Sequence, residues 1–119
     1  IRYTRNASSM QLLEIYNNSA IFACASVDEG FGLTGAESML CGCALASTDY
    51  SGVNDYAKHN RNALLSPVND AVKLAENIME LIENENLRIK LAEQGNKDMS
   101  MRNWDRNVLL LEEELLKNI

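Results

Sequence analysis

The chain has 119 residues, of which 46% are hydrophobic, so it can bury the core of one compact domain but not of two full-sized ones. Its 11 lysines and arginines against 17 aspartates and glutamates give a formal charge of −6, which disfavours nucleic-acid binding because no basic face is available for a polyanion. No apolar run is long enough to cross a membrane, and the amino end lacks the apolar block of a secretion signal, so we expect a cytoplasmic domain.

The amino end, IRYT, is strand-like and begins at Ile1 without an initiator methionine, which indicates a piece of a longer protein. A helix is predicted next, over residues 8–18, where leucine, isoleucine and tyrosine recur at helical spacing. Ser8 and Gln11 can form a capping box that satisfies the first free amides of this helix.

Three short apolar runs predict strands that are buried on both faces, because each is too brief for a helix and is flanked by polar residues. They are residues 20–25, 44–47 and 63–65. Turn or helix signals follow each run. Alternating strands and helices imply right-handed crossovers and a parallel sheet, which is the α/β class with a Rossmann-like sheet and flanking helices.

From residue 70 onward the pattern is helical alone, and apolar residues form three stripes. The stripes are Ala71, Leu74, Ala75, Ile78 and Ile82, then Leu87 and Leu91, then Trp104, Val108, Leu111 and Leu115. Gly95 is placed to end the second of these helices. We expect the stripes to pack in the core rather than to line a cofactor site.

The cysteines give no sign of a metal site. Cys24, Cys41 and Cys43 are an odd number, and His59 is the single histidine. We expect three reduced thiols that mostly fill the core, and neither a metal nor another cofactor.

The segment that carries chemistry is EGFGLTGAE, residues 29–37, between a predicted strand and a predicted helix that runs to about Cys41. Gly30 and Gly32 leave out side chains where the backbone would meet a ligand, and Thr34 is suited to cap the helix. Free amides and the positive helix end would then face the space above the carboxyl edge of the sheet, where ligands bind in open parallel sheets. The segment predicts a site for an anion or a polyhydroxylated group.

Two carboxylates, Glu29 in the loop and Glu37 in the first turns of the helix, add acceptors for sugar hydroxyls beside those donors. Two simpler interpretations stay open, because Thr34 and Glu37 have the spacing of a capping box and Glu29 can be a solvated loop residue. A paired-carboxylate hydrolase is a further alternative, but no histidine or second acid at a fixed spacing supports it.

Four blocks of the chain also carry a family resemblance. EGFGL followed by Glu37 and SMLCGCALAS looks like an E-x7-E signature with an EAMACG-type helix. NNSAIFACAS is similar to an ADIFVLPS strand, GVNDYAKHNRNALL to a GGVxEYVxDGxNGLL segment, and WDRNV to an SWERV helix start. In the order in which they follow one another along the chain, the blocks resemble the carboxyl-terminal domain of GT-B glycosyltransferases of the large retaining family 4, glycosyl transferases group 1. Four blocks in register, over almost the whole chain, are far more specific than a lone E-x7-E.

The resemblance implies a transferase that moves a sugar from a nucleotide-sugar donor to an acceptor with retention at the anomeric carbon. The residues that would bind the donor are Glu29, Gly30, Phe31, Gly32, Leu33 and Glu37. The first glutamate and the amides after it would hold the sugar and the distal phosphate, and the second glutamate would hold the ribose. Preorganised amides and a helix end can stabilise a departing nucleoside diphosphate without a metal. No nucleophile is assigned.

Four positions depart from the family pattern, and none of them is one of the proposed donor-binding residues. Thr34 stands where the family often has proline, Asp55 replaces a usual glutamate, and Asn60 and Ala63 replace frequent glycines. Asparagine tolerates left-handed backbone and alanine does so less readily, which leaves the geometry of that turn open.

Two upstream strands of the family domain, and a separate amino-terminal domain that binds the acceptor sugar or lipid-linked glycan, have no counterpart in residues 1–119. We therefore expect an incomplete GT-B carboxyl-terminal domain with no transferase activity of its own and at best weak donor affinity. If the family's sheet order holds, the missing strands separate the first strand from strand 20–25, and the open edges favour self-association. The full-length protein is expected in the cytoplasm, including the inner face of the membrane.

Two other classes of protein are alternatives to the donor-binding part of a glycosyltransferase. A noncatalytic module of the same fold would only bind a nucleotide-sugar or a partner protein. A module freed from donor binding has no chemical need for two glycines and two acids in one loop. A receiver-type signalling domain needs acids at the carboxyl ends of two strands and a lysine after a later strand. Asp28 and Asp49 are the only candidate acids, and no lysine is so placed.

Overall fold

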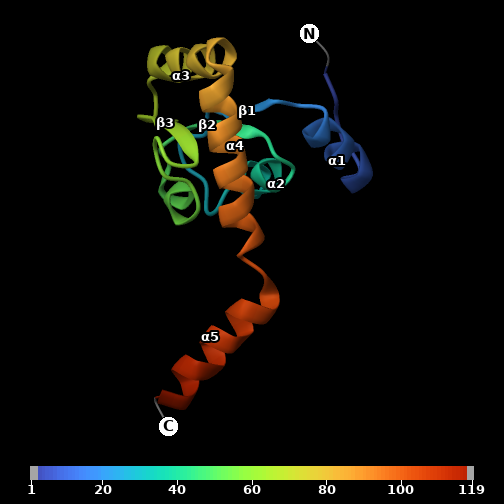
Figure 1. Cartoon of the computed structure of the whole chain (residues 1–119), viewed down its shortest axis with the longest axis vertical. Helices are drawn as coiled ribbons and strands as arrows, with labels where there is room; N and C mark the ends of the chain where they lie inside the picture. The colour runs from blue at the N-terminus through green and yellow to red at the C-terminus, as the bar shows by residue number, and fades with distance from the viewer. Residues whose placement is uncertain (1–2, 118–119) are drawn as a thin grey trace.

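The computed structural model describes residues 3–117, except for the side chain of Trp104, and Figure 1 shows the order of its elements. They are α1 Ser9–Asn17, β1 Ile21–Cys24, α2 Leu33–Leu40, β2 Ala44–Thr48, the 3-10 helix η1 Ser51–Asp55, β3 Ala63–Ser66, α3 Ala71–Glu83, α4 Glu85–Ser100 and α5 Trp104–Lys117. The predicted alternation followed by helices alone is confirmed. Ile1 of the predicted first strand lies outside the described residues, and Tyr3 and Thr4 form no strand.

The capping box predicted at the start of α1 is present. The Ser8 amide donates to Gln11 Oε1 at 2.8 Å, and Ser8 Oγ accepts from the Gln11 amide at 3.3 Å. Two of the free amides at the start of this helix are thereby satisfied by local side chains, as the sequence predicted.

The sheet is parallel throughout, with the strand order β1-β2-β3. In its register Phe22 lies opposite Leu45, and Leu45 lies opposite Ala63. Side chains from alternate strand positions enter two hydrophobic clusters, one shared with α2 and the other with α3. Because helices cover both faces, β2 is buried along its whole length.

The prediction that β1 is buried on both faces is wrong. Its residues are half-buried, and Ala23 is exposed. No strand among the described residues pairs with the outer side of β1, which is therefore an edge strand with free backbone donors and acceptors.

Gly95 does not end a helix, contrary to the sequence prediction, but lies within α4. A Cβ atom at this position would stand 2.9 Å from Met39 Cε and 3.3 Å from the carbonyl oxygen of Asn62. The glycine therefore serves the close approach of α4 to α2 and to the loop before β3. From there α4 joins the two clusters, with Leu91 in one and Met99 in the other.

The predicted apolar stripes meet the core only in part. In α3, Leu74, Asn77 and Leu81 are buried and Ile78 is half-buried. Asn77 is polar, so the apolar pattern did not include it in the predicted stripe. Ala71, Ala75 and Ile82 of the predicted stripe are exposed. Leu91 of the second stripe is buried and Leu87 is half-buried.

The described part of the third stripe is not packed, and the prediction that Val108, Leu111 and Leu115 lie in the core is wrong. The side chain of Trp104, also predicted in this stripe, lies outside the described residues. α5 extends away from the sheet and the other helices (Figure 1), and all its described side chains are exposed, including Val108, Leu111 and Leu115. Helical periodicity indicates an apolar face but not what covers it. None of the described helices is both long and apolar enough to span a bilayer.

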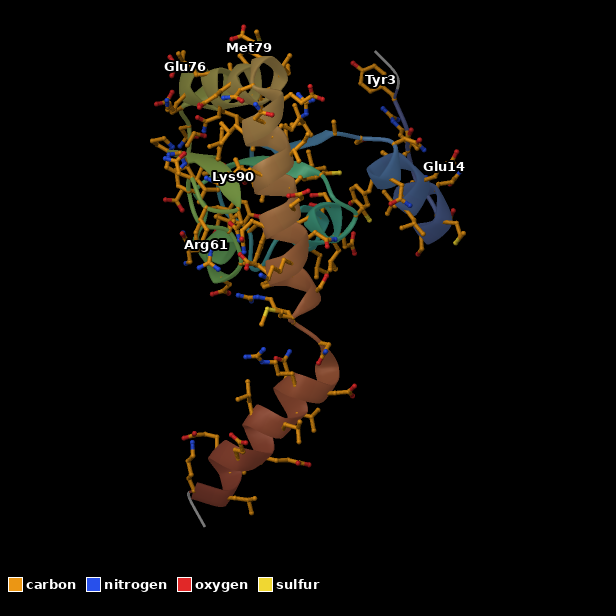
Figure 2. The ribbon with its side chains drawn as sticks, viewed as in Figure 1. Tyr3, Glu14, Arg61, Glu76, Met79 and Lys90 are labelled. Carbon is orange, nitrogen blue, oxygen red and sulfur yellow. The ribbon has the colours of Figure 1, made fainter. Side chains whose placement is uncertain are left out.

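The carboxylate of Asp98 ties α4 to the loop before β3. It accepts hydrogen bonds from Gln94 at 2.7 Å, from Asn62 at 2.9 Å and from Arg61, labelled in Figure 2, at 3.2 Å. Desolvation by burial acts to raise the pKa of Asp98, but the three hydrogen bonds and the charge of Arg61 outweigh it and lower that pKa.

The lowered pKa of Asp98 predicts that α4 docking is sensitive to acid. A carboxyl group whose pKa is lower in the folded than in the unfolded state stabilises the fold above the unfolded pKa of about 4 and loses this contribution as the pH falls through the folded pKa. Between about pH 7 and about pH 3, the melting temperature should therefore fall more steeply for the parent than for Asp98→Asn.

The matched control is Asp28→Asn, at an exposed acid without a hydrogen-bond partner among the described residues. This variant should follow the parent over the whole pH range. Parallel pH curves for the parent and Asp98→Asn would contradict the assignment.

Candidate functional site

The glycine loop, residues 29–33, leaves the carboxyl end of β1 and leads directly into α2. Gly32 is the N-cap of this helix and has a left-handed backbone with φ of +82°. Thr34 therefore lies inside the helix as its second residue, and no side chain within residues 3–117 caps the start. The predicted Thr34 cap is wrong, because the left-handed glycine starts the helix two residues earlier than a threonine cap would.

The amides of residues 30–34 have no acceptor among the described residues. The first carbonyl of the helix, that of Gly32, accepts from the amides of Gly35 at 3.0 Å and Ala36 at 3.2 Å. The N–H groups before these two stay available at the positive end of the helix dipole. A row of donors at a helix start is suited to a phosphate or another anion, and the predicted anion site at this loop stays a prediction.

Two buried tyrosines, Tyr50 and Tyr56, contact the loop from the protein interior, and neither was predicted from the sequence as part of the site. The hydroxyls of Tyr50 and Tyr56 lie 2.9 Å apart, and the Tyr56 hydroxyl donates to the carbonyl oxygen of Gly32 at 3.0 Å. Burial is the largest cause of the raised pKa of both phenols. A buried tyrosine hydroxyl needs a polar partner, but the sequence contains no signal for which carbonyl provides it.

The two glycines of the loop have different reasons to be glycine. A Cβ atom on Gly32 would stand 1.9 Å from the Tyr50 hydroxyl oxygen, so the fold itself requires glycine there. A Cβ atom on Gly30 would meet nothing within 4 Å, and this residue is exposed. The described residues therefore place no steric demand on Gly30.

The 3-10 helix η1 packs against the loop at Gly52. A Cβ atom on Gly52 would lie 1.8 Å from the carbonyl oxygen of Gly30 and 2.8 Å from that of Glu29. Phe31 turns inward beside this contact, with its ring centroid 5.0 Å from that of Tyr56. Leu33, in contrast, points to solvent.

The two acids are held by different parts of the fold. Glu29 is half-buried and accepts from Ser26 Oγ at 3.1 Å. Glu37 is exposed on α2 and accepts from the Tyr16 hydroxyl of α1 at 3.4 Å. Burial and then the charge of Glu37 raise the pKa of Tyr16. No side chain among the described residues bridges Glu29 and Glu37, and the alternative in which Glu37 completes a capping box with Thr34 is wrong.

The departures from the family pattern in the turn before β3 cause no backbone strain. Asn60 has a left-handed backbone with φ of +60°, which asparagine tolerates. Ala63 has no positive φ and pairs with Leu45 in the sheet. Asp55 ends η1, and its backbone carbonyl accepts a hydrogen bond from Arg102.

The three thiols are free, and only Cys43 is fully buried. Its Sγ donates to backbone carbonyls of residues 16 and 19 at 3.3 and 3.2 Å. Cys24 and Cys41 are half-buried. Within residues 3–117 no three His, Cys, Asp or Glu side chains are grouped so that they could hold a metal ion.

The close approach of η1 predicts that Gly52→Ala destabilises the fold. The added Cβ meets a backbone carbonyl, so the loop must shift, and overpacking of this kind lowers the melting temperature by about 5 to 10 °C in a domain of this size. Gly30→Ala, on the other side of the same contact but with its Cβ facing open space, should melt with the parent. Equal melting temperatures for the two variants would show that η1 does not restrain the loop.

A family model with the description glycosyl transferases group 1 matches residues 1–98. Among sequence relatives, an N,N'-diacetylbacillosaminyl-diphospho-undecaprenol alpha-1,3-N-acetylgalactosaminyltransferase from Campylobacter jejuni is 29% identical over 113 residues, which cover 91% of this chain and 30% of the relative. The chain spans less than a third of the length of each of these curated relatives.

Two solved structures have the same fold. The carboxyl-terminal domain of a glycosyl transferase group 1 family protein (LpcC) from Francisella tularensis matches with a TM-score of 0.73 and 25% identity, over 86% of this chain and 51% of that one. HepE from Anabaena, in complex with UDP-glucose, matches with a TM-score of 0.78 and 22% identity, over 92% of this chain and 30% of that one. The predicted fold class, a partial Rossmann-like sheet of the GT-B carboxyl-terminal type, is confirmed.

Proposed function

The chain belongs to the glycosyl transferases group 1 family, and we propose that it is the nucleotide-sugar-binding part of a retaining glycosyltransferase that transfers a hexosyl unit. The observation that carries this proposal is the row of amides at residues 30–34, which have no acceptor in the part of the chain that the structure describes and lie at the start of a helix above the carboxyl edge of a parallel sheet. HepE, which has the same fold, was solved with UDP-glucose, and a donor of this class carries the diphosphate that such amides suit.

In this proposal each part of the site has one task. The amides of residues 30–33 hold the distal phosphate, Glu29 accepts from hydroxyls of the donor sugar, and Glu37 accepts from the ribose hydroxyls. Each carboxylate has one oxygen without a partner among the described residues. The fixed amide dipoles favour the negative charge that develops on the departing nucleoside diphosphate.

Gly30 distinguishes this proposal from a module of the same fold that does not bind a donor. Gly32 is required by the Tyr50 hydroxyl whether or not a ligand binds, so its presence says nothing about function. Gly30 has open space where its Cβ would be, and a close ligand is the reason that we propose for a glycine there.

The remaining parts of the proposal concern the longer protein. We propose that another domain binds the acceptor, a sugar or a lipid-linked glycan, in the cytoplasm or at the inner face of the membrane. The name of the Campylobacter relative, which includes a diphospho-undecaprenol group, supports the lipid-linked acceptor. The 119-residue chain alone is proposed to be inactive and to self-associate through the unpaired edge of β1.

Calorimetric titration of the full-length protein with a panel of nucleotide-sugars that includes UDP-glucose tests the donor site. Gly30→Ala should raise the Kd of the bound donor by about tenfold or more, because a methyl group enters the space of the phosphate, while the melting temperature stays unchanged. Unchanged affinity in Gly30→Ala, or a parent that binds no member of the panel, would contradict the proposal.

Glu37→Gln, in the same titration, tests the assignment to ribose. The amide keeps the shape of the side chain but loses its charge, and hydrogen bonds to charged groups contribute about 1.5 to 3 kcal/mol, so the Kd should rise about tenfold or more. Glu14→Gln, on the exposed side of α1 (Figure 2), is the matched control and should bind as the parent does. Equal affinity of both variants would remove Glu37 from the site.

A further inference from the structure

We propose that Tyr50 and Tyr56 are a positioning pair, whose joined hydroxyls fix the carbonyl of Gly32 and so aim the free amides of residues 30–34 at the donor. The inference rests on the proposed function and adds to it two residues that lie outside the E-x7-E segment. Neither residue is assigned a contact with the donor.

The hydrogen bonds of the pair run in one direction only. A carbonyl oxygen can only accept, so the Tyr56 hydrogen points to Gly32 at 3.0 Å. With that hydrogen engaged, Tyr50 must be the donor in the 2.9 Å bond between the two hydroxyls. The result is a chain from Tyr50 through Tyr56 to Gly32, in which the second bond depends on Tyr56 alone and the first polarises it.

The pair stays protonated and fixed under ordinary conditions. Tyr50 is 2% and Tyr56 3% exposed, and burial raises the pKa of both phenols, so neither loses its hydrogen near neutral pH. Cβ atoms built on Gly32 and Gly35 would stand 2.9 and 2.5 Å from the Tyr56 hydroxyl oxygen. The hydroxyls therefore fill the space directly against the first turn of α2.

The two tyrosines also flank η1, the 3-10 helix that packs against the beginning of the loop at Gly30. Tyr50 is the N-cap and Tyr56 the C-cap of η1, and Gly52 of η1 packs against the carbonyl of Gly30. One short helical turn thus contacts the loop at Gly30 and at Gly32. Donors for an anion are effective when their direction is set before the ligand arrives, and this arrangement sets it from one element, η1 with its two capping tyrosines.

The test compares Tyr56→Phe and Tyr50→Phe in the full-length protein, with UDP as the calorimetric probe. Tyr56→Phe removes the bond to Gly32 and should weaken UDP binding about tenfold, whereas Tyr50→Phe leaves that bond in place and should weaken binding only about twofold to threefold. Tyr3→Phe, at an 86% exposed residue near the amino end (Figure 2), should have no effect.

Amide resonances of residues 30–34 in the ligand-free variants provide a readout that stability alone does not move. They should shift in Tyr56→Phe and remain near parental values in Tyr3→Phe. If Tyr56→Phe melts earlier but binds UDP as tightly as the parent below its melting temperature, the pair is structural only and the inference is wrong. If Tyr56→Phe does not fold, an unchanged Kd and unchanged resonances in Tyr50→Phe overturn it.

A failure of the proposed function is distinguishable from a failure of this inference. A parent that binds neither UDP nor any nucleotide-sugar contradicts the proposed function, and the inference falls with it even if the amide resonances shift. A parent that binds UDP, together with Tyr variants that bind equally well, contradicts the positioning pair alone.

Discussion

The close contact between η1 and the loop after β1 is the constraint on which the site depends. Gly52 meets the carbonyl of Gly30, and the tyrosine hydroxyls meet Gly32. These contacts hold Gly32 in a left-handed conformation in which it can begin α2 without a capping side chain. Since no side chain in the described part of the chain satisfies the first amides, they stay available to a ligand. The same contacts that shape the loop therefore leave free the amides that we propose to bind an anion.

The arrangement of strands and helices could be predicted from the sequence because it depends on local patterns. Short apolar runs between turn signals gave the three strands, and the spacing of Ser8 and Gln11 gave the first cap. Errors arose where a distant element decides the outcome. Gly95 looks like a helix end but accommodates Met39, and α5 has an apolar stripe that no described residue covers. The edge position of β1 likewise depends on which strands are present.

The sequence indicated the residues of the candidate site, but it did not indicate the side chains that contact the loop from the protein interior. The glycines and both acids stand out in the sequence, whereas Tyr50 and Tyr56 look like core residues until their hydroxyls are placed against Gly32. The structure also separates two meanings of glycine that the sequence cannot separate, since Gly32 is required by the fold and Gly30 is not. Likewise, Glu37 does not cap α2 but accepts a hydrogen bond from Tyr16 of α1.

A crystal structure of the full-length protein with UDP tests the central claim most directly. The account predicts that oxygens of the diphosphate lie within about 3 Å of amide nitrogens of residues 30–34, at normal hydrogen-bond distance. It also predicts that the Tyr56 hydroxyl still donates to Gly32 in that complex. A diphosphate bound elsewhere, with these amides engaged by carbonyls from another part of the protein, would contradict it.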